Sequence, residues 1–115
     1  MKPVVIIPVY NHEHAIAAVV SSVRKHGLPV LLVDDGSKPS CAAVMDSLVK
    51  APEVTVFRRT KNGGKGAAVM SGLEEANRLG FTHAVQIDAD GQHDLVDLPK
   101  FLEQATNNPE ALVIG

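Results

Sequence analysis

The sequence contains little cysteine and few aromatic residues. Its single cysteine, Cys41, excludes a disulfide within the chain and a zinc site built from several cysteines. Tryptophan is absent, and one tyrosine and three phenylalanines are the only aromatic residues, so aliphatic side chains must form the core. Such sparse use of cysteine is typical of a reducing compartment, and we therefore expect a cytoplasmic location.

The sequence also lacks a long apolar run and an excess of charge of one sign. Residues 4–9 are apolar, but this run is too short to span a membrane and contains Pro8. Eleven basic and thirteen acidic residues give a formal net charge of −2, which provides no general attraction to a phosphate backbone. We expect no membrane-spanning segment in these residues and no nucleic-acid partner.

What is present is typical of one small globular domain covering residues 1–115, because 45% of the residues are apolar and 21% are charged. Short apolar runs alternate with segments of helical periodicity. The apolar runs predict strands at residues 2–9, 29–33, 54–57, 82–87 and 111–114. The periodic segments predict helices from residue 13 to Gly27, around 44–49, from 66 to about 80, and over 96–106, with Asn11 as the cap of the first.

This alternation predicts an α/β fold, a Rossmann-like and mostly parallel sheet with right-handed crossovers and helices on both faces. In such sheets ligands gather at the carboxyl ends of the strands. Polar clusters stand at these ends: Tyr10 and Asn11, Asp34 and Asp35, and Asp88 and Asp90. Carboxylates gathered at one edge repel each other unless a cation or a buried proton relieves them.

Asp88 and Asp90 form the sharpest of these features. Because side chains alternate along an extended segment, both carboxylates point to one side, and the small Ala89 between them lets a ligand approach. A hard cation such as Mg²⁺ or Mn²⁺, completed by waters and a diphosphate, suits such a pair, and Gln92 can add a neutral oxygen. The alternative is an acidic turn at the end of a strand.

Two further clusters have both a functional and a structural interpretation. Asp34 and Asp35 either form a tight turn that caps the next helix, or one of them accepts hydrogen bonds from a ligand's ring or sugar. Adjacent side chains point in different directions, so we do not expect both to face a ligand. We favour Asp35 for this contact, because it lies further out from the strand. Residues 62–66 contain three glycines and Lys65, but their spacing fails the P-loop pattern. Lys65 can pair with a phosphate or a carboxylate; the alternative is a solvated, flexible turn.

Four motifs together resemble the family 2 glycosyltransferases: IIPVYN at 6–11, VDDGS at 33–37, NGGKG at 62–66 and DADGQH at 88–93. The last motif is similar to that of the dolichyl- and polyprenyl-phosphate sugar synthases. The resemblance implies a GT-A fold and inverting transfer of a sugar from a UDP or GDP donor to a lipid-phosphate or glycan acceptor. It also implies work at the cytoplasmic face of a membrane, with peripheral association.

The resemblance further implies roles for individual residues. Asp35 would read the base, Lys65 would lie near the nucleotide, and Asp90 would bind the Mg²⁺ or Mn²⁺ that bridges the diphosphate. The full implied nucleotide-binding set is Pro8, Tyr10, Asn11, Asp34, Asp35, Lys65, Asp88, Ala89 and Asp90, and the metal set is Asp88, Asp90 and Gln92.

Members of this family continue beyond a strand like 111–114 into an acceptor-binding half that usually supplies the catalytic base. We therefore expect residues 1–115 to be the donor-binding portion, with the base beyond Gly115, and expect this portion alone to transfer sugar poorly. One alternative is a non-catalytic nucleotide-binding module. Another is a receiver-like phosphoacceptor domain, which would carry its acidic pair after the first strand and a lysine after the last, unlike this sequence.

Overall fold

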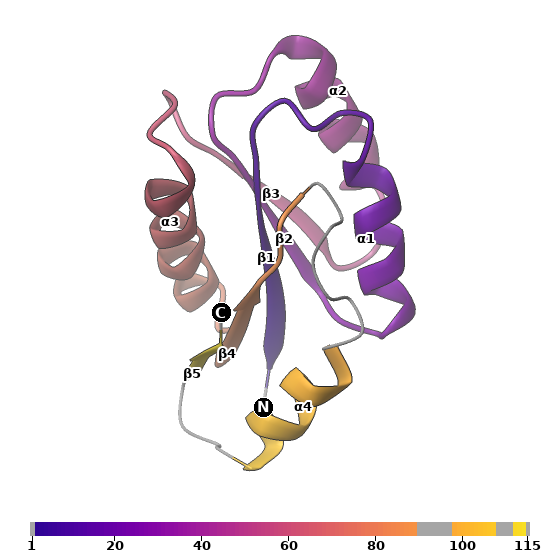
Figure 1. Ribbon diagram of the computed structural model, residues 1–115, viewed down its shortest axis with the longest axis vertical. Coiled ribbons are helices and arrows are strands. Elements are labelled where there is room, and N and C mark those ends of the chain that lie inside the picture. Colours follow the sequence, from indigo (N-terminus) through magenta and orange to yellow (C-terminus); the bar gives the residue numbers. More distant parts are fainter. Residues whose placement is uncertain (1, 90–97, 108–111, 115) are drawn as a thin grey trace.

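The computed structural model describes residues 2–89, 98–107 and 112–114, and these alternate between strands and helices (Figure 1). The strands are β1 (Pro3–Val9), β2 (Val30–Asp34), β3 (Val54–Arg58), β4 (His83–Gln86) and β5 (Leu112–Ile114). The helices are α1 (Ile16–Lys25), α2 (Pro39–Leu48), α3 (Lys65–Arg78) and α4 (Leu98–Asn107). None of the helices in these ranges has the length and hydropathy that crossing a membrane requires.

The strands form a five-stranded sheet in the order β3-β2-β1-β4-β5, and every neighbouring pair is parallel. Val5 pairs with Val30 on one side of β1, and Pro3 pairs with His83 on the other. The chain therefore leaves β1 toward β2 and later returns to the other side of β1 at β4. This order confirms the predicted Rossmann-like parallel sheet and places its topological switch point between β1 and β4.

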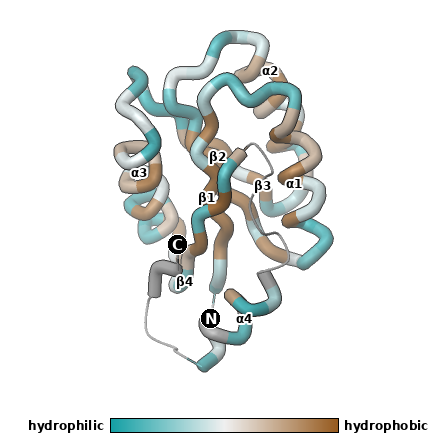
Figure 2. Tube along the Cα trace, viewed as in Figure 1, coloured by the Kyte–Doolittle hydropathy of each residue, from teal (hydrophilic) through white to brown (hydrophobic). Residues whose placement is uncertain are grey.

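The central strands are buried on both faces, as their continuous apolar runs predict. All of β2 is buried, and β1 is buried from Val4 to Val9. Alternate residues of β1 belong to two cores, with Val5 and Ile7 on one face of the sheet and Val4 and Ile6 on the other. Figure 2 shows hydrophobic residues concentrated in these central strands.

Helices cover both faces of the sheet, which confirms that prediction. α1 and α2 pack on one face and α3 on the opposite face, on either side of the sheet in Figure 1. α3 approaches the sheet closely at Gly72, where an added Cβ would lie 2.7 Å from Cγ2 of Ile6. The positive φ of Gly27, 75°, follows the C-terminus of α1 as the sequence predicts.

α4 departs from the predicted crossover geometry. Its Phe101 is buried in the same core as Ile16 of α1, so both helices lie on one face of the sheet. The connection from β1 to β2 and the connection from β4 to β5 cross the sheet in opposite directions. Because the helices of both connections lie on the same face, the two crossovers have opposite hands. The expectation of uniformly right-handed crossovers is therefore wrong here. α4 thus lies on the face on which α1 and α2 also pack, while α3 contacts β4 from the other face.

Candidate functional site

A cavity of about 450 Å³ lies at the carboxyl ends of the strands, at the switch point of the sheet. Pro8 and Tyr10 line it from the end of β1, and Asp35 lines it from the residue after β2. Lys65 lines it from the start of α3, and Asp88 from the segment after β4. The fold thus brings together residues from four distant parts of the sequence, as the sequence analysis predicts.

The other predicted residues divide into three groups. Ala89 also lines the cavity, and it is buried. Asn11 and Asp34 are absent from the lining. Asp90 and Gln92 lie outside the described residues. The cavity has further lining residues that the sequence-based set omits, His12, Asn62 and Gly64 among them, although the last two belong to the glycine-rich motif noted above.

Asn11 joins two loops instead of capping α1. Its backbone N–H donates to Oγ of Ser37 at 3.0 Å, and its Oδ1 accepts from the N–H of Lys38 at 2.7 Å. The N-cap position of α1 is Ala15, which makes no side-chain cap, so the predicted cap is wrong. The φ of Asn11 is 59°, a left-handed conformation that asparagine tolerates better than most residues, and this conformation turns the chain toward the loop after β2.

Asp34 stabilises the turn after β2. Its Oδ1 accepts from the N–H of Ser37 at 2.8 Å, and its Oδ2 pairs with Nε of Arg58 at 3.2 Å. Arg58 also donates to Oδ1 of Asp46 on α2 at 2.6 Å. These carboxylates, Asp46 first and Asp34 second, raise the pKa of the Arg58 guanidinium. The turn interpretation therefore holds for Asp34, with its two carboxylate oxygens held by protein donors. The predicted cap of the next helix is wrong, because the N-cap position of α2 is Lys38, which has no side-chain cap.

Asp35 points to the cavity and to the glycine-rich loop. Its Oδ1 accepts from Nε of Arg59 at 2.9 Å and from the N–H of Gly63 at 3.0 Å, and its Oδ2 accepts from the N–H of Gly64 at 2.9 Å. The side chain of Asn62 donates to the Asp35 carbonyl at 3.1 Å. The residue is only 3% exposed, so its charge is balanced by these donors more than by water.

Arg59 connects Asp35 to α3. In addition to the bond that its Nε makes to Asp35, Arg59 donates through Nη1 to the carbonyl of Ala67 at 3.2 Å and to Oγ of Ser71. An added Cβ on Gly63 would lie 2.5 Å from Nη2 of Arg59, so glycine is needed where the loop packs on the guanidinium. The glycine-rich segment is therefore tied to the end of β3 and to the first turns of α3 through one side chain.

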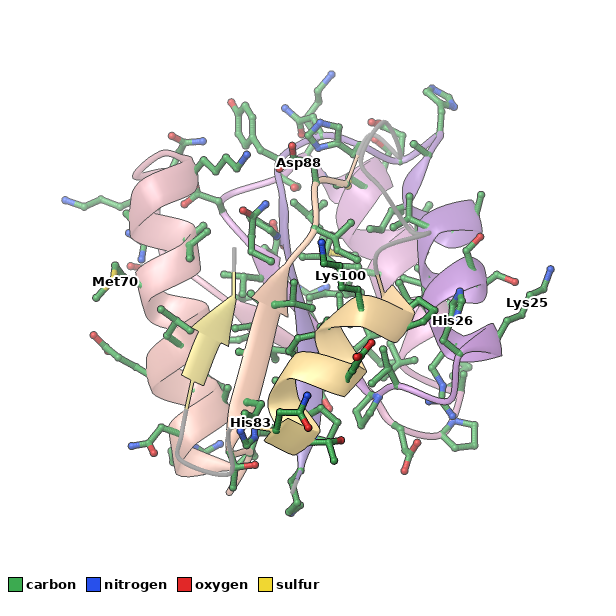
Figure 3. The ribbon with its side chains drawn as sticks, turned by 60° about the horizontal axis from the view of Figure 1, so that its bottom comes forward. Lys25, His26, Met70, His83, Asp88 and Lys100 are labelled. Carbon is green, nitrogen blue, oxygen red and sulfur yellow. The ribbon has the colours of Figure 1, made fainter. Side chains whose placement is uncertain are left out.

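Lys65 and Asp88 meet across the cavity. Nζ of Lys65 lies 2.5 Å from Oδ1 of Asp88, and Nε2 of Gln86 donates to the same oxygen at 2.7 Å. The Lys65 side chain is 58% exposed and that of Asp88 is 21% exposed, so solvent screens this pair in part. Figure 3 shows Asp88 beyond the end of β4, with His83 at the opposite end of that strand.

The described part of the site fits a hard divalent cation in part. Within the described ranges, no group of three or more His, Cys, Asp or Glu side chains is placed to hold a metal by itself. Asp88 does offer a carboxylate at the cavity wall. Mg²⁺ is usually held by one or two carboxylates together with waters and substrate phosphates, so Asp88 and a diphosphate in the cavity would suit it.

Residues 4–115 match the family model of glycosyl transferase family 2. A UDP-N-acetylglucosamine–dolichyl-phosphate N-acetylglucosaminyltransferase from Methanococcus voltae is 33% identical over 96% of this chain and 49% of its own length. A polyprenol monophosphomannose synthase from Mycolicibacterium smegmatis is 36% identical over 99% of this chain and 44% of its own length. This chain thus spans about half the length of the curated relatives it matches.

Two solved structures share the fold. A mannosyltransferase from Pyrobaculum calidifontis, solved with GDP-Man and Mn²⁺, has a TM-score of 0.67 and 24% identity over 77% of this chain and 27% of its own. The S. aureus protein TarS has a TM-score of 0.72 and 22% identity over 95% of this chain and 33% of the solved one. These likenesses confirm the expected GT-A fold and leave the receiver-like alternative without support. On its family match and its relatives, this chain belongs to glycosyl transferase family 2.

Proposed function

We propose that this chain is the donor-binding portion of an inverting glycosyltransferase that moves a sugar from a nucleoside diphosphate to a lipid-phosphate acceptor. The observation that carries the proposal is the cavity at the switch point, where Lys65 and Asp88 meet and Asp35 lies among the lining residues. Nucleotides bind at this place in open parallel sheets. A positive charge beside a carboxylate is the chemistry that a diphosphate and its metal need.

The β1 side of the cavity suits the nucleoside. Tyr10 is 48% exposed although it is aromatic, and it stands beside Pro8 at the cavity wall. An exposed aromatic face and a rigid ring offer a surface for a base and a ribose. Asp35 would accept a hydrogen bond from the base through the remaining capacity of Oδ2, and Asn11 would hold the loop that carries Tyr10.

The β4 side suits the diphosphate. Lys65 would pair with a phosphate oxygen, and Asp88 would contribute one carboxylate to Mg²⁺ or Mn²⁺, with Asp90 and Gln92 as its further predicted ligands. When bound, the cation would neutralise the negative charge that develops on the departing nucleoside diphosphate. Lys65 would contribute to the same stabilisation as a point charge.

The catalytic base is proposed to lie outside these residues. Of the carboxylates that line the cavity in the described ranges, Asp35 accepts three hydrogen bonds at its oxygens and Asp88 is paired with Lys65. Both carboxylates are thus already bound by donors of the protein itself, and we propose neither of them as the base. The acceptor-binding half of the longer relatives is the expected source of the base.

The names of the relatives support the proposed acceptor class. These names mention dolichyl phosphate, polyprenol monophosphomannose and undecaprenyl phosphate. A lipid-phosphate acceptor would bring the enzyme to the cytoplasmic face of a membrane as a peripheral protein. A glycan acceptor is the second candidate, and a non-catalytic nucleotide-binding module with the same cavity is the alternative from another class; an assay of sugar transfer by a longer chain separates these.

Calorimetric titration of UDP and GDP, first with Mn²⁺ and then with EDTA, tests the donor site. We expect one nucleotide to bind in a metal-dependent manner, and we expect Asp88→Asn and Asp90→Ala to lose the metal-dependent part of the affinity. Asp46→Asn is the matched control, because Asp46 is an exposed carboxylate on α2 that pairs with Arg58. Equal nucleotide affinity with Mn²⁺ in the parent and both cavity variants would count against the site assignment.

A further inference from the structure

The N-terminus of α3 carries an anion that belongs to the protein itself. The first N–H groups of a helix lack partners within the helix and attract negative charge, and for this reason they often bind phosphate. Here the N–H of Gly64, the N-cap residue of α3, donates to Oδ2 of Asp35, and the N–H of Gly63 donates to Oδ1. The carboxylate of Asp35 thus lies at the entry to α3, bound to the N–H groups of the N-cap residue and of the residue before it.

Arg59 completes this arrangement from the other side. Its side chain is 21% exposed, and it donates through Nε to Oδ1 of Asp35 at 2.9 Å. Through Nη1 it holds Ala67 and Ser71 on the first turns of α3. The guanidinium therefore fixes the helix and the loop to the same carboxylate, and a planar group with several donors is suited to do this where a lysine is not.

We infer that Arg59 is a positioning residue, and that the Asp35–Arg59 pair anchors the entry to α3 at Gly63 and Gly64 and thereby presents Lys65 to the diphosphate. This inference rests on the proposed function for the role of Lys65. Lys65 directly follows the two anchored residues, so the anchor sets the direction in which its side chain leaves the loop. Its ammonium, 2.5 Å from Asp88, then lies in the cavity.

This arrangement gives Gly63 and Gly64 a role other than binding a phosphate. A glycine-rich loop before a helix is a usual sign that backbone N–H groups cradle a phosphate. In this structure the N–H groups of Gly63 and Gly64 already have a partner, and Gly63 is the place where the loop packs against Arg59. The close approach that Gly63 permits is therefore made to the protein's own ion pair, whereas Gly64 is the residue with a φ of 90°.

The first test removes the internal anion. Asp35→Ala would leave two N–H groups and a guanidinium without their acceptor, so small anions should bind there and stabilise the variant. We expect formate, compared with chloride at equal ionic strength, to raise the thermal midpoint of Asp35→Ala by several degrees and to leave the parent unchanged. Asp34→Ala is the control, since Asp34 is equally buried but binds a different arginine and only one N–H.

If Asp35→Ala does not fold in chloride, refolding in formate and the isosteric Asp35→Asn serve the same comparison. Recovery of the fold by formate would support the internal anion, and equal behaviour in both salts would overturn it. This experiment requires no nucleotide, so its outcome is separate from that of the proposed function.

The second test measures the positioning of Lys65. We expect Arg59→Met to weaken binding of UDP or GDP, whichever the parent prefers, by about tenfold, and to weaken binding of the corresponding nucleoside less, because the N–H groups of Gly63 and Gly64 still hold Asp35. In a Lys65→Met background the same substitution should change the affinity less than twofold, because the contact it positions is already lost. Arg58→Met, which removes an arginine that pairs with Asp34 and Asp46, should leave the ratio of the two affinities as in the parent.

Independent and additive losses from Arg59→Met and Lys65→Met, or an equal loss for nucleoside and nucleoside diphosphate, would show that Arg59 only stabilises the fold. If the parent binds neither nucleotide, the proposed function fails. The formate experiment still decides whether Asp35 and Arg59 anchor the entry to α3.

Discussion

Lys65 pairs with the described carboxylate that we propose as a metal ligand. Its ammonium is 2.5 Å from Oδ1 of Asp88. If Asp88 holds the metal as proposed, the lysine would compete with the cation for Asp88 in the free protein and would pair with the diphosphate in the complex. Lys65→Met keeps the length and the apolar stem of the side chain but removes the charge. We therefore expect it to raise the affinity of the free protein for Mn²⁺ and to lower the affinity for the nucleotide in the presence of Mn²⁺.

The size of each effect follows from the geometry. Because Lys65 is 58% exposed and Asp88 is 21% exposed, their pair should contribute no more than an exposed ion pair does, about 0.2–1 kcal/mol. Without this competitor, Mn²⁺ alone should bind about 1.5 to 5 times more tightly. The loss of a charged hydrogen bond to the diphosphate, about 1.5–3 kcal/mol, should weaken binding of the nucleotide with Mn²⁺ by about tenfold or more.

The assay follows free Mn²⁺ by electron paramagnetic resonance in the absence of nucleotide, and nucleotide affinity at saturating Mn²⁺ by calorimetry. Lys61→Met is the matched control, because it removes the same charge from the connection that leads to α3 but from a residue that is absent from the cavity lining. If Lys65→Met leaves the Mn²⁺ affinity unchanged or lowers it, or if Lys61→Met has the same effect, the competition between lysine and metal is refuted.

Two further predictions concern the scaffold. Gly72→Ala should lower the thermal midpoint, because overpacking against Cγ2 of Ile6 at 2.7 Å, about 1–3 kcal/mol, outweighs the gain in helix propensity of about 1 kcal/mol. Gly66→Ala, where the added Cβ meets open space, should raise it, and shifts of the same sign would contradict the close packing of α3. The pKa of the Glu13 carboxyl lies below its usual value, first through a backbone hydrogen bond and then through the hydroxyl of Ser40. Ser40→Ala should raise this pKa part of the way back, as an NMR titration would show. The carboxylate stabilises the fold above its unfolded pKa and loses that effect as pH falls through the lower folded pKa, so the pH dependence of stability should weaken in the variant.

The sequence predicts the scaffold well because local pattern and topology agree there. β1 and β2 are buried on both faces, so their apolar runs carry a strong signal, and each strand ends where polar residues begin. Parallel pairing then brings the carboxyl ends to one edge whatever the details of packing. For this reason the positions of Tyr10, Asp35 and Asp88 along the chain are enough to predict that they share a single cavity.

The contacts between side chains at that edge of the sheet cannot be predicted from sequence patterns. Arg59 and Asp35 are joined through space by the order of β2 and β3 in the sheet, and no spacing in the sequence signals their contact. Asn11 has the composition of a helix cap, but its left-handed backbone and its bonds to the next loop prevent that role. The face that α4 covers is likewise a tertiary property, since Phe101 joins the core on which α1 and α2 pack.

The pairing of charges in the cavity gives a physical reason for the metal-dependent nucleotide binding that we propose. Among the described residues of the site, Asp35 is paired with Arg59 and Asp88 with Lys65, so the acidic and basic side chains offset each other. A diphosphate would bring negative charge into a site without a surplus of positive charge, and Asp90, next along the chain from Ala89, adds a further carboxylate to the same segment. Lys65 cannot neutralise the phosphates and Asp88 at the same time. A divalent cation bound with the nucleotide would resolve this conflict, because Asp88 would then hold the cation and the Lys65 ammonium would pair with a phosphate oxygen.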